Sequence, residues 1–247
     1  MLFPIGDDNS DNTVFPFVNY IFIAINIAVF VFLQGFGAND AFTMAFAAVP
    51  REILTGVDIA APIIVRDDFG QRALIPLQPT PIPVYATILT SMFMHGGFAH
   101  IAGNMLYLWI FGDNLENRLG HLRYAVFYLV CGTIAALAHV LTDVNSVIPT
   151  LGASGAISGV LGGYLLLFPR RRVLVIMFFF VTAVPASLAL GAWIAFQVFQ
   201  NYFAPPTAGG VAYMAHIGGF IAGLLLVKVF AVGTKPATPK YADFQKP

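Results

Sequence analysis

The stretch Thr150–Pro169, TLGASGAISGVLGGYLLLFP, decides how this chain folds. It opens with small residues, carries two serines, and continues as an apolar run that ends at a proline. Small residues four positions apart let two helices pack closely. A polar side chain inside an apolar segment is costly to bury and is therefore a candidate for function. The stretch is thus a packing face, a catalytic face, or both.

The composition places this stretch in a membrane. Of the 247 residues, 58% are hydrophobic and 10% are charged, whereas soluble domains carry about 25% charged residues. The formal net charge is zero and gives no indication of nucleic-acid binding. The single cysteine, Cys131, allows neither a disulfide framework nor a cysteine metal cluster. The first residues lack a positive region before the first apolar run, so we expect no cleavable signal peptide.

Apolar segments of about 20 residues are long enough to cross ~30 Å of hydrocarbon. Six segments meet this length and predict an all-α membrane protein with six transmembrane helices. They are Phe15–Leu33, Tyr85–Phe111, Tyr124–Leu141, Leu151–Phe168, Val173–Phe199 and Val211–Val232. The predicted membrane domain covers 14–232, between an N-terminal tail (1–13) and a C-terminal tail (233–247). Residues 34–84 form a long outer connection with two short apolar pieces, which we expect to be interfacial or re-entrant.

Lysines and arginines predict the orientation. With six spans, all twelve of them except Arg51, Arg66 and Arg72 fall on one side. These three lie in the long connection, where the positive-inside rule is weak. Both termini are therefore predicted to be cytoplasmic.

Three polar features lie at one depth on the even-numbered spans. His100, Ser154 and His216 are 13, 15 and 12 residues from Asp113, Pro169 and Lys228, the residues that mark the cytoplasmic ends of their spans. At ~1.5 Å per residue their heights above these ends are about 20, 22 and 18 Å. Scattered packing residues need not share a level in this way.

Glycines are spaced so that the fourth and sixth spans can approach. Small residues recur one turn apart beside the serine and beside the histidine, which favours close helix packing. The positions concerned are Gly155, Gly159, Gly163, Gly219 and Gly223. A serine hydroxyl becomes a good nucleophile when an adjacent base accepts its proton. Contact between these faces would bring Ser154 to His216.

The start of the fourth span also offers donors for a developing oxyanion. The main-chain N–H groups of Ala153 and Ser154 have no partner within the helix, and the positive end of the helix dipole lies behind them. His100 and Asn104 are spaced i and i+4, so they share one face of the second span. They are candidates for further donors.

Other interpretations stand beside these. Taken alone, GASGAISG favours packing over catalysis, and Asn104 alone is typical of interhelical hydrogen bonding. Ser158 is expected to bond back to a main-chain carbonyl, and His95 to cap or bond the adjacent loop. The aromatic run Phe178–Phe180 is expected to face lipid. There is no HExxH motif, and no carboxylate is placed to orient the histidine, which predicts a dyad.

Three motifs together resemble those of the rhomboid family of intramembrane serine proteases, over nearly all of 14–230. They are HGGFAHIAGN (95–104), GASGAISG (152–159) and AHIGGFIAG (215–223). The resemblance implies Ser154 as nucleophile, His216 as general base, and an oxyanion hole of His100, Asn104 and the N–H groups of Ala153 and Ser154. It also implies packing glycines near the site, namely Gly152, Gly155, Gly159, Gly219 and Gly223.

The resemblance further implies single-span membrane proteins as substrates, no cofactor or metal, and a multi-pass protein of a bacterial inner membrane. Substrates would enter between the second and fifth spans, with a gate around Phe178–Trp193 and a cap at Gln200–Gly210. Two departures are visible. The long connection has VPREILTG (49–56) and lacks the family's Trp-Arg pair, and Ser158 stands where some members stack a tyrosine on the histidine. His95 and Ser158 are possible supporting residues.

Two other functions remain open. A non-catalytic protein of the same fold would hold transmembrane segments without cutting them, and the absence of Ser154 or His216 would favour it. A small transporter would explain polar midplane residues but predicts an inverted repeat, which the sequence does not display.

Overall fold

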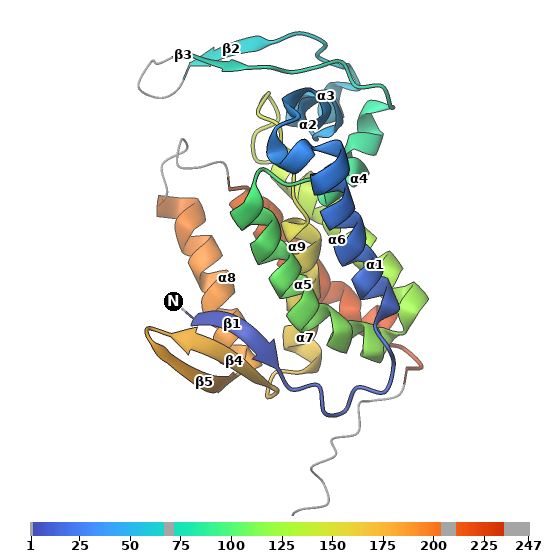
Figure 1. The fold of residues 1–247 in the computed structure, drawn as a ribbon, viewed down its shortest axis with the longest axis vertical. Helices are drawn as coiled ribbons and strands as arrows, with labels where there is room; N and C mark the ends of the chain where they lie inside the picture. Colours follow the sequence, from blue (N-terminus) through green and yellow to red (C-terminus); the bar gives the residue numbers. More distant parts are fainter. Residues whose placement is uncertain (1, 67–71, 204–210, 235–247) are drawn as a thin grey trace, which may run out of the picture.

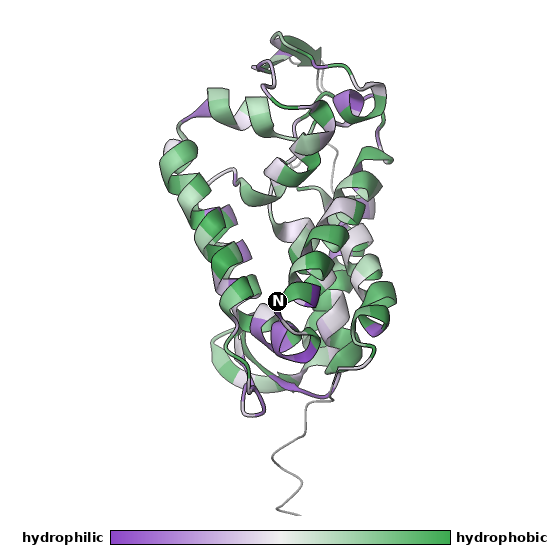
Figure 2. Ribbon diagram, turned by 90° about the vertical axis from the view of Figure 1, so that its right-hand side faces the viewer, coloured by the Kyte–Doolittle hydropathy of each residue, from purple (hydrophilic) through white to green (hydrophobic). Residues whose placement is uncertain are grey.

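The computed structural model describes residues 2–66, 72–203 and 211–234. Its centre is a helical bundle (Figure 1). The bundle helices are α1 (Phe17–Ala28, continued by a π-helical turn Val29–Leu33), α5 (Phe98–Leu119), α6 (His121–Val140), α7 (Ser154–Leu167), α8 (Ala186–Phe203) and α9 (Tyr213–Phe230). Among the described residues, two helices, α6 and α9, are long and apolar enough to cross a membrane by length and composition. Apolar residues cover much of the bundle helices (Figure 2).

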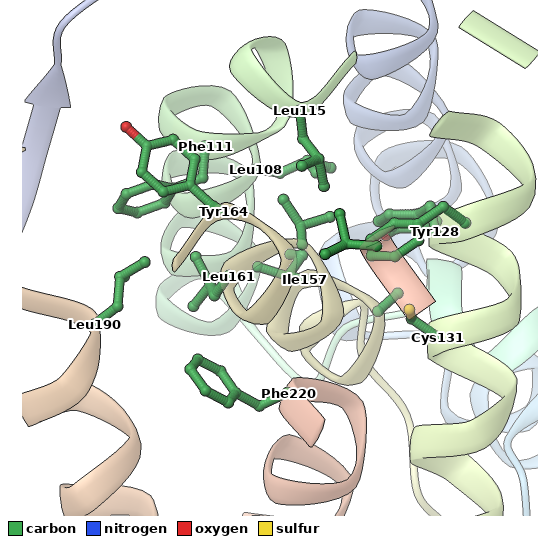
Figure 3. Close-up of a cluster of buried hydrophobic side chains, with 14 of the residues drawn as sticks. Leu108, Phe111, Leu115, Tyr128, Cys131, Ile157, Leu161, Tyr164, Leu190 and Phe220 are labelled. Carbon is green, nitrogen blue, oxygen red and sulfur yellow. The ribbon is translucent and has the colours of Figure 1, made fainter. Parts of the chain in front are cut away.

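Helix α7 lies at the centre of the bundle. Every residue from Gly155 to Tyr164 is buried, as expected for a helix that is apolar on all sides. Figure 3 shows Ile157, Leu161 and Tyr164 of this helix among side chains of its neighbours. These neighbours are Leu108, Phe111 and Leu115 of α5, Tyr128 and Cys131 of α6, Leu190 of α8 and Phe220 of α9. The helix that begins at Ser154 is therefore fixed from several sides.

Glycines set the distance between α7 and α9. A Cβ atom added at Gly219 would lie 2.1 Å from the carbonyl oxygen of Gly155, and one added at Gly223 would lie 2.0 Å from that of Gly159. No side chain fits in such a contact, so main chain lies against main chain. On the other side of α7, a Cβ at Gly155 would lie 2.7 Å from the Cβ of Ala135 in α6.

The expected second span is not one helix. Residues from Val84 form short helical pieces, 3-10 Val84–Ala86, α4 (Thr87–Thr90) and 3-10 Ser91–Phe93, and α5 begins only at Phe98. Two consecutive glycines, Gly96 and Gly97, weaken the helix at the break. The main chain there bonds outside the helix instead. The N–H of His95 donates to Gln34 Oε1 at 2.9 Å, and Gln34 Nε2 donates to the carbonyl of His95 at 3.0 Å.

The expected fifth span is wrong over its first half, and the all-α class needs a correction. Strands β4 (Arg172–Met177) and β5 (Phe180–Pro185) form an antiparallel hairpin, and α8 begins only at Ala186. Strand β1 (Leu2–Asp7) pairs with β4, so the sheet order is β1-β4-β5. Branched residues favour strands, and an apolar run does not by itself distinguish a buried helix from a strand. Residues 2–7, expected in a tail, are thus part of the fold.

The long connection covers one end of the bundle (Figure 1). It contains a 3-10 turn (Gly35–Gly37), α2 (Asp40–Phe46), α3 (Pro50–Thr55) and a hairpin of β2 (Ile63–Arg66) and β3 (Arg72–Ile75). Of the two short apolar pieces expected to be interfacial or re-entrant, one forms the helix α2 and the other contributes to β2 of this hairpin. An isolated bridge joins Ala48 to Thr150, with hydrogen bonds of 3.1 and 2.8 Å. The connection therefore holds the segment that leads into Ser154.

Candidate active site

A serine and a histidine meet across α7 and α9. Ser154 is the first residue of α7, and His216 lies in the first turn of α9. Their side chains are in hydrogen-bond contact, with 2.8 Å between His216 Nε2 and Ser154 Oγ. The glycine contacts between the two helices begin one residue after Ser154, at Gly155. Close packing of the main chains therefore brings the two side chains together.

The second ring nitrogen of His216 also has a partner. Gln197 of α8 places its Oε1 atom 2.7 Å from His216 Nδ1, and only 6% of Gln197 is exposed. An amide oxygen only accepts, so Nδ1 carries the proton and Nε2 presents its lone pair to Ser154. Gln197 was not predicted from the sequence, because the group that orients a catalytic histidine is typically a carboxylate. A glutamine inside an apolar segment was the signal that could have revealed it.

The aromatic neighbours of His216 come from Trp193 and Tyr213, while Ser158 bonds to the main chain. Ser158 lies one helical turn after Ser154, and its hydroxyl donates a hydrogen bond to the main-chain carbonyl of Ser154 at 2.7 Å. The ring of Trp193, from α8, lies 5.9 Å from the His216 ring at an angle of 37°. Tyr213 approaches the same ring edge-on at 6.5 Å. Helix α8 thus supplies both a hydrogen bond and an aromatic contact to His216.

His100 and Asn104 face the same space from α5. The N–H of Gly96 donates to His100 Nδ1 at 3.3 Å, so the neutral ring carries its proton on Nε2. This Nε2 lies beside Gly152, where an added Cβ would be 2.9 Å from Nε2 and 3.7 Å from Ser154 Oγ. Asn104 is 8% exposed, and its Nδ2 has no hydrogen-bond partner. Among the described residues, neither His100 Nε2 nor Asn104 Nδ2 has an acceptor, and both side chains line the same cavity as Ser154.

The residues before α7 complete this arrangement. Gly152 has φ +133°, a conformation that favours glycine, and its N–H donates to the carbonyl of Ser91 at 2.8 Å. Ala153 is the N-cap of α7 and is fully buried. The N–H groups at this helix start have no carbonyl partner within the helix. They add donors at the positive end of the α7 dipole.

His95 is not part of this cluster of donors. It lies in the break before α5, fully buried, with its ring edge-on to His100 at 5.1 Å. Its main chain bonds to Gln34 as described, and both ring nitrogens lack partners among the described residues. His95 therefore contacts His100 and does not approach Ser154 directly.

A cavity of about 940 Å³ contains the pair. Its walls come from five bundle helices, with His100 and Asn104 on one side and Trp193 and Gln197 on another. Within the described residues, no group of three histidine, cysteine, aspartate or glutamate side chains is placed to hold a metal ion. A serine hydroxyl in contact with a histidine ring nitrogen, with further N–H groups lining the same cavity, is an arrangement that could carry out acyl transfer. The proposed cap at Gln200–Gly210 lies outside the described residues from 204 onward.

Comparison with known proteins shows which family the chain resembles. The family model of the rhomboid domain matches residues 84–232. Rhomboid protein 1, mitochondrial, from Saccharomyces cerevisiae is 36% identical over 164 residues, covering 64% of this chain and 45% of that protein. Presenilin-associated rhomboid-like protein, mitochondrial, from Bos taurus is 33% identical, and the match covers 70% of this chain and 47% of that protein. Rhomboid protease GluP from Bacillus subtilis is 26% identical, and the match covers 84% of this chain and 34% of that protein.

These relatives also bear on location. The chain spans less than half the length of each of these three proteins. Two of them are named as mitochondrial and the third is bacterial, so they do not support the expected bacterial inner membrane in particular. The family is one of integral membrane proteins, which agrees with the apolar helices of the bundle. With a domain match over more than half of its residues, the chain belongs to the rhomboid family.

Proposed function

We propose that this chain is an intramembrane serine endopeptidase that cleaves single-span membrane proteins within or next to the bilayer. The observation that carries the proposal is the hydrogen-bonded series from Gln197 through His216 to Ser154, with distances of 2.7 and 2.8 Å. A histidine held in the tautomer that accepts a serine proton is what nucleophilic catalysis by serine requires. The name of the relative GluP describes a protease, which supports the same reaction class.

Acylation follows from the geometry. Ser154 Oγ attacks the scissile carbonyl carbon while His216 Nε2 accepts its proton. The negative charge on the carbonyl oxygen is stabilised by His100 Nε2–H, Asn104 Nδ2–H and the N–H groups at the start of α7. One such preorganised donor contributes about 3–4 kcal/mol. His216 then gives its proton to the leaving amine, the C–N bond breaks, and an acyl-enzyme remains.

Deacylation reverses the roles. His216 takes a proton from water, the hydroxide attacks the ester carbonyl, and Ser154 leaves with the proton returned to its oxygen. Gln197 accepts from Nδ1–H in both halves and stabilises the imidazolium that forms transiently. In this reaction a glutamine takes the orienting place that an aspartate has in a triad, without its charge.

The membrane arrangement is part of the proposal. Helices α1, α5, α6, α7, α8 and α9 cross the bilayer, both termini face the cytoplasm, and the site lies in the outer half. Substrates enter between α5 and α8, whose residues form two walls of the cavity. Two of the relatives above are named as mitochondrial and one comes from a bacterium, so the proposal specifies an integral membrane protein and no particular organelle.

The experiment is cleavage of a model single-span substrate by the purified chain in lipid vesicles. Wild type, Ser154→Ala and His216→Ala are compared, with binding of the substrate measured in parallel. Cleavage by the wild type alone, with binding retained in the variants, is expected. A folded wild type that binds the substrate but never cleaves it would establish the alternative, a non-catalytic rhomboid-like binding protein.

A further inference from the structure

The cavity that holds Ser154 and His216 extends to the N-terminal strand. Phe3, from β1, lines the same cavity, although it is far from the other lining residues in sequence. Its side chain is 44% exposed. Figure 1 shows β1 crossing the end of the bundle between α8 and the pair α5 and α7. A residue of the predicted N-terminal tail therefore lines the candidate site.

Strand β1 is held there by two kinds of contact. It pairs with β4 from Leu2–Met177 to Asp7–Val173, with an irregularity between Pro4 and Gly6. Its last residue, Asp7, accepts a hydrogen bond at 2.5 Å from the hydroxyl of Tyr164, which is on the same helix as Ser154.

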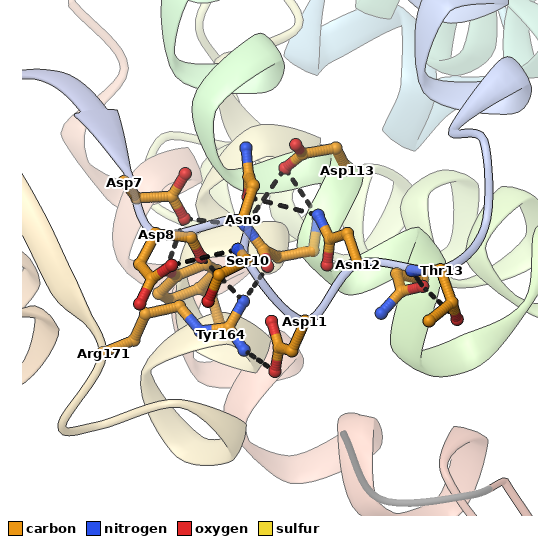
Figure 4. A network of polar contacts seen from close by, with 12 residues as sticks. Asp7, Asp8, Asn9, Ser10, Asp11, Asn12, Thr13, Asp113, Tyr164 and Arg171 are labelled. Atoms are coloured by element: carbon orange, nitrogen blue, oxygen red, sulfur yellow. Dashed lines mark hydrogen bonds and ion pairs between the residues drawn. The ribbon is translucent and has the colours of Figure 1, made fainter. Parts of the chain in front are cut away.

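The segment after β1 is anchored as well. Arg171 donates to the carbonyl of Asp8 at 3.0 Å and pairs with Asp11 at 2.5 Å (Figure 4). Because these contacts run to α7 and to the start of β4, Phe3 has a fixed place relative to Ser154.

The depth of the cavity gives the length of chain that it can hold. Along α7 its lining runs from Ser154 to Leu161, and along α5 it runs from Phe98 to Tyr107. The depth below the nucleophile is taken along α7. Seven residues of helix span ~10 Å. An extended peptide covers ~3.3 Å per residue, so about three residues fit between the scissile bond and the end of the cavity.

We propose that Phe3 closes the deep end of the substrate cleft and contacts the substrate about three residues from the scissile bond, on its cytoplasmic side. The N-terminal strand is then a specificity-determining part of the substrate site. This inference rests on the proposed protease function. The occupant is an extended polypeptide, because the cavity is continuous with the serine–histidine pair and has polar walls at that end and an aromatic floor at the other.

Disulfide trapping tests the contact without requiring catalysis. Phe3→Cys is made in a Ser154→Ala background and mixed with model substrates that carry one cysteine at successive positions on the cytoplasmic side. Cross-linking is expected to peak at roughly the third position and to fall to background beyond the fifth. The matched control is Phe179→Cys, at the turn of the same sheet, which is 97% exposed and does not line the cavity. The native Cys131 is buried and serves as the background.

Activity tests the specificity. Phe3→Ala should raise kcat/KM for a substrate with tryptophan at the third position, relative to one with alanine there, by about tenfold. Phe179→Ala should leave that ratio unchanged. The inference would be overturned if Phe3→Ala left the ratio of the two kcat/KM values unchanged and if cross-linking at position 3 were no higher than at position 179. A lipid chain would then be the occupant of the deep end of the cavity. A wild type that cleaves nothing would refute the protease function, while the cross-linking result would still be interpretable.

Discussion

Replacing Gln197 by leucine removes the acceptor for His216 Nδ1–H and keeps an apolar side chain of similar size. The lost bond is 2.7 Å long and lies at a residue that is only 6% exposed, so water does not readily replace it. A hydrogen bond to a group that becomes charged is worth about 1.5–3 kcal/mol. Since ~1.4 kcal/mol corresponds to a factor of ten in rate, we expect acylation to slow by ~10- to 100-fold.

The measurement is the rate at which a fluorophosphonate labels the folded protein, together with kcat and KM on a model substrate. Gln197→Leu should lower kcat with little change in KM, because the bond acts on the base and not on the substrate. Gln197→Glu keeps an acceptor oxygen in place and should recover most of the rate. A merely structural role for Gln197 would not produce this rescue.

The chain offers a matched control one turn further along α8. Among the described residues, Gln200 makes one long hydrogen bond, 3.5 Å, to the hydroxyl of Tyr213 and none to His216. Gln200→Leu should therefore label at the wild-type rate. Labelling of Gln197→Leu at that same rate, with equal thermal stability, would refute the orienting role.

Three further predictions follow from the packing, the oxyanion donors and the N-terminal strand. Gly219→Ala places a Cβ 2.1 Å from the carbonyl oxygen of Gly155, so the free energy of unfolding, measured by thermal unfolding, should fall by at least about 1–3 kcal/mol. Gly191→Ala, whose Cβ meets open space, should leave it unchanged. Asn104→Ala removes an oxyanion donor and should lower kcat ~10²–10³-fold with little change in KM. Burial raises the pKa of the Asp7 carboxyl from 3.8 to about 7, so an ionised Asp7 destabilises the docked β1. This destabilisation is fully present above pH 7 and disappears as the pH falls towards 4. Asp7→Asn should therefore slow proteolysis of the N-terminal segment at pH 8 and have little effect near pH 4, and an equal effect at both would contradict this assignment.

Much of the candidate site could be predicted because it depends on regular quantities. Helix rise is constant, so distances from the span ends predicted that Ser154, His100 and His216 lie at one level. Glycine spacing then indicated which faces meet, and the structure has Gly219 against Gly155. Neither inference needed a distant contact to be known in advance.

The remainder depended on contacts between distant segments. The pairing of β1 with β4 joins residues 2–7 to residues 173–177. No local pattern in the N-terminal residues predicts this pairing. An apolar run from Val173 is long enough for a helix, yet it folds as a hairpin because β1 completes a sheet beside it. Which of Gln197 and Gln200 faces His216 depends on the rotation of α8, which packing sets and sequence period does not.

The proposed protease function depends most on the reactivity of one serine. Fluorophosphonate labelling of the intact chain in lipid, with the modified residue located by mass spectrometry, tests it directly. Ser154 alone should be labelled, and Ser154→Ala and His216→Ala should lose labelling, while Ser158→Ala, the neighbouring serine one turn away, should retain it. A correctly folded wild type that is not labelled at Ser154, or a Ser154→Ala protein that still cleaves substrate, would contradict the central claim.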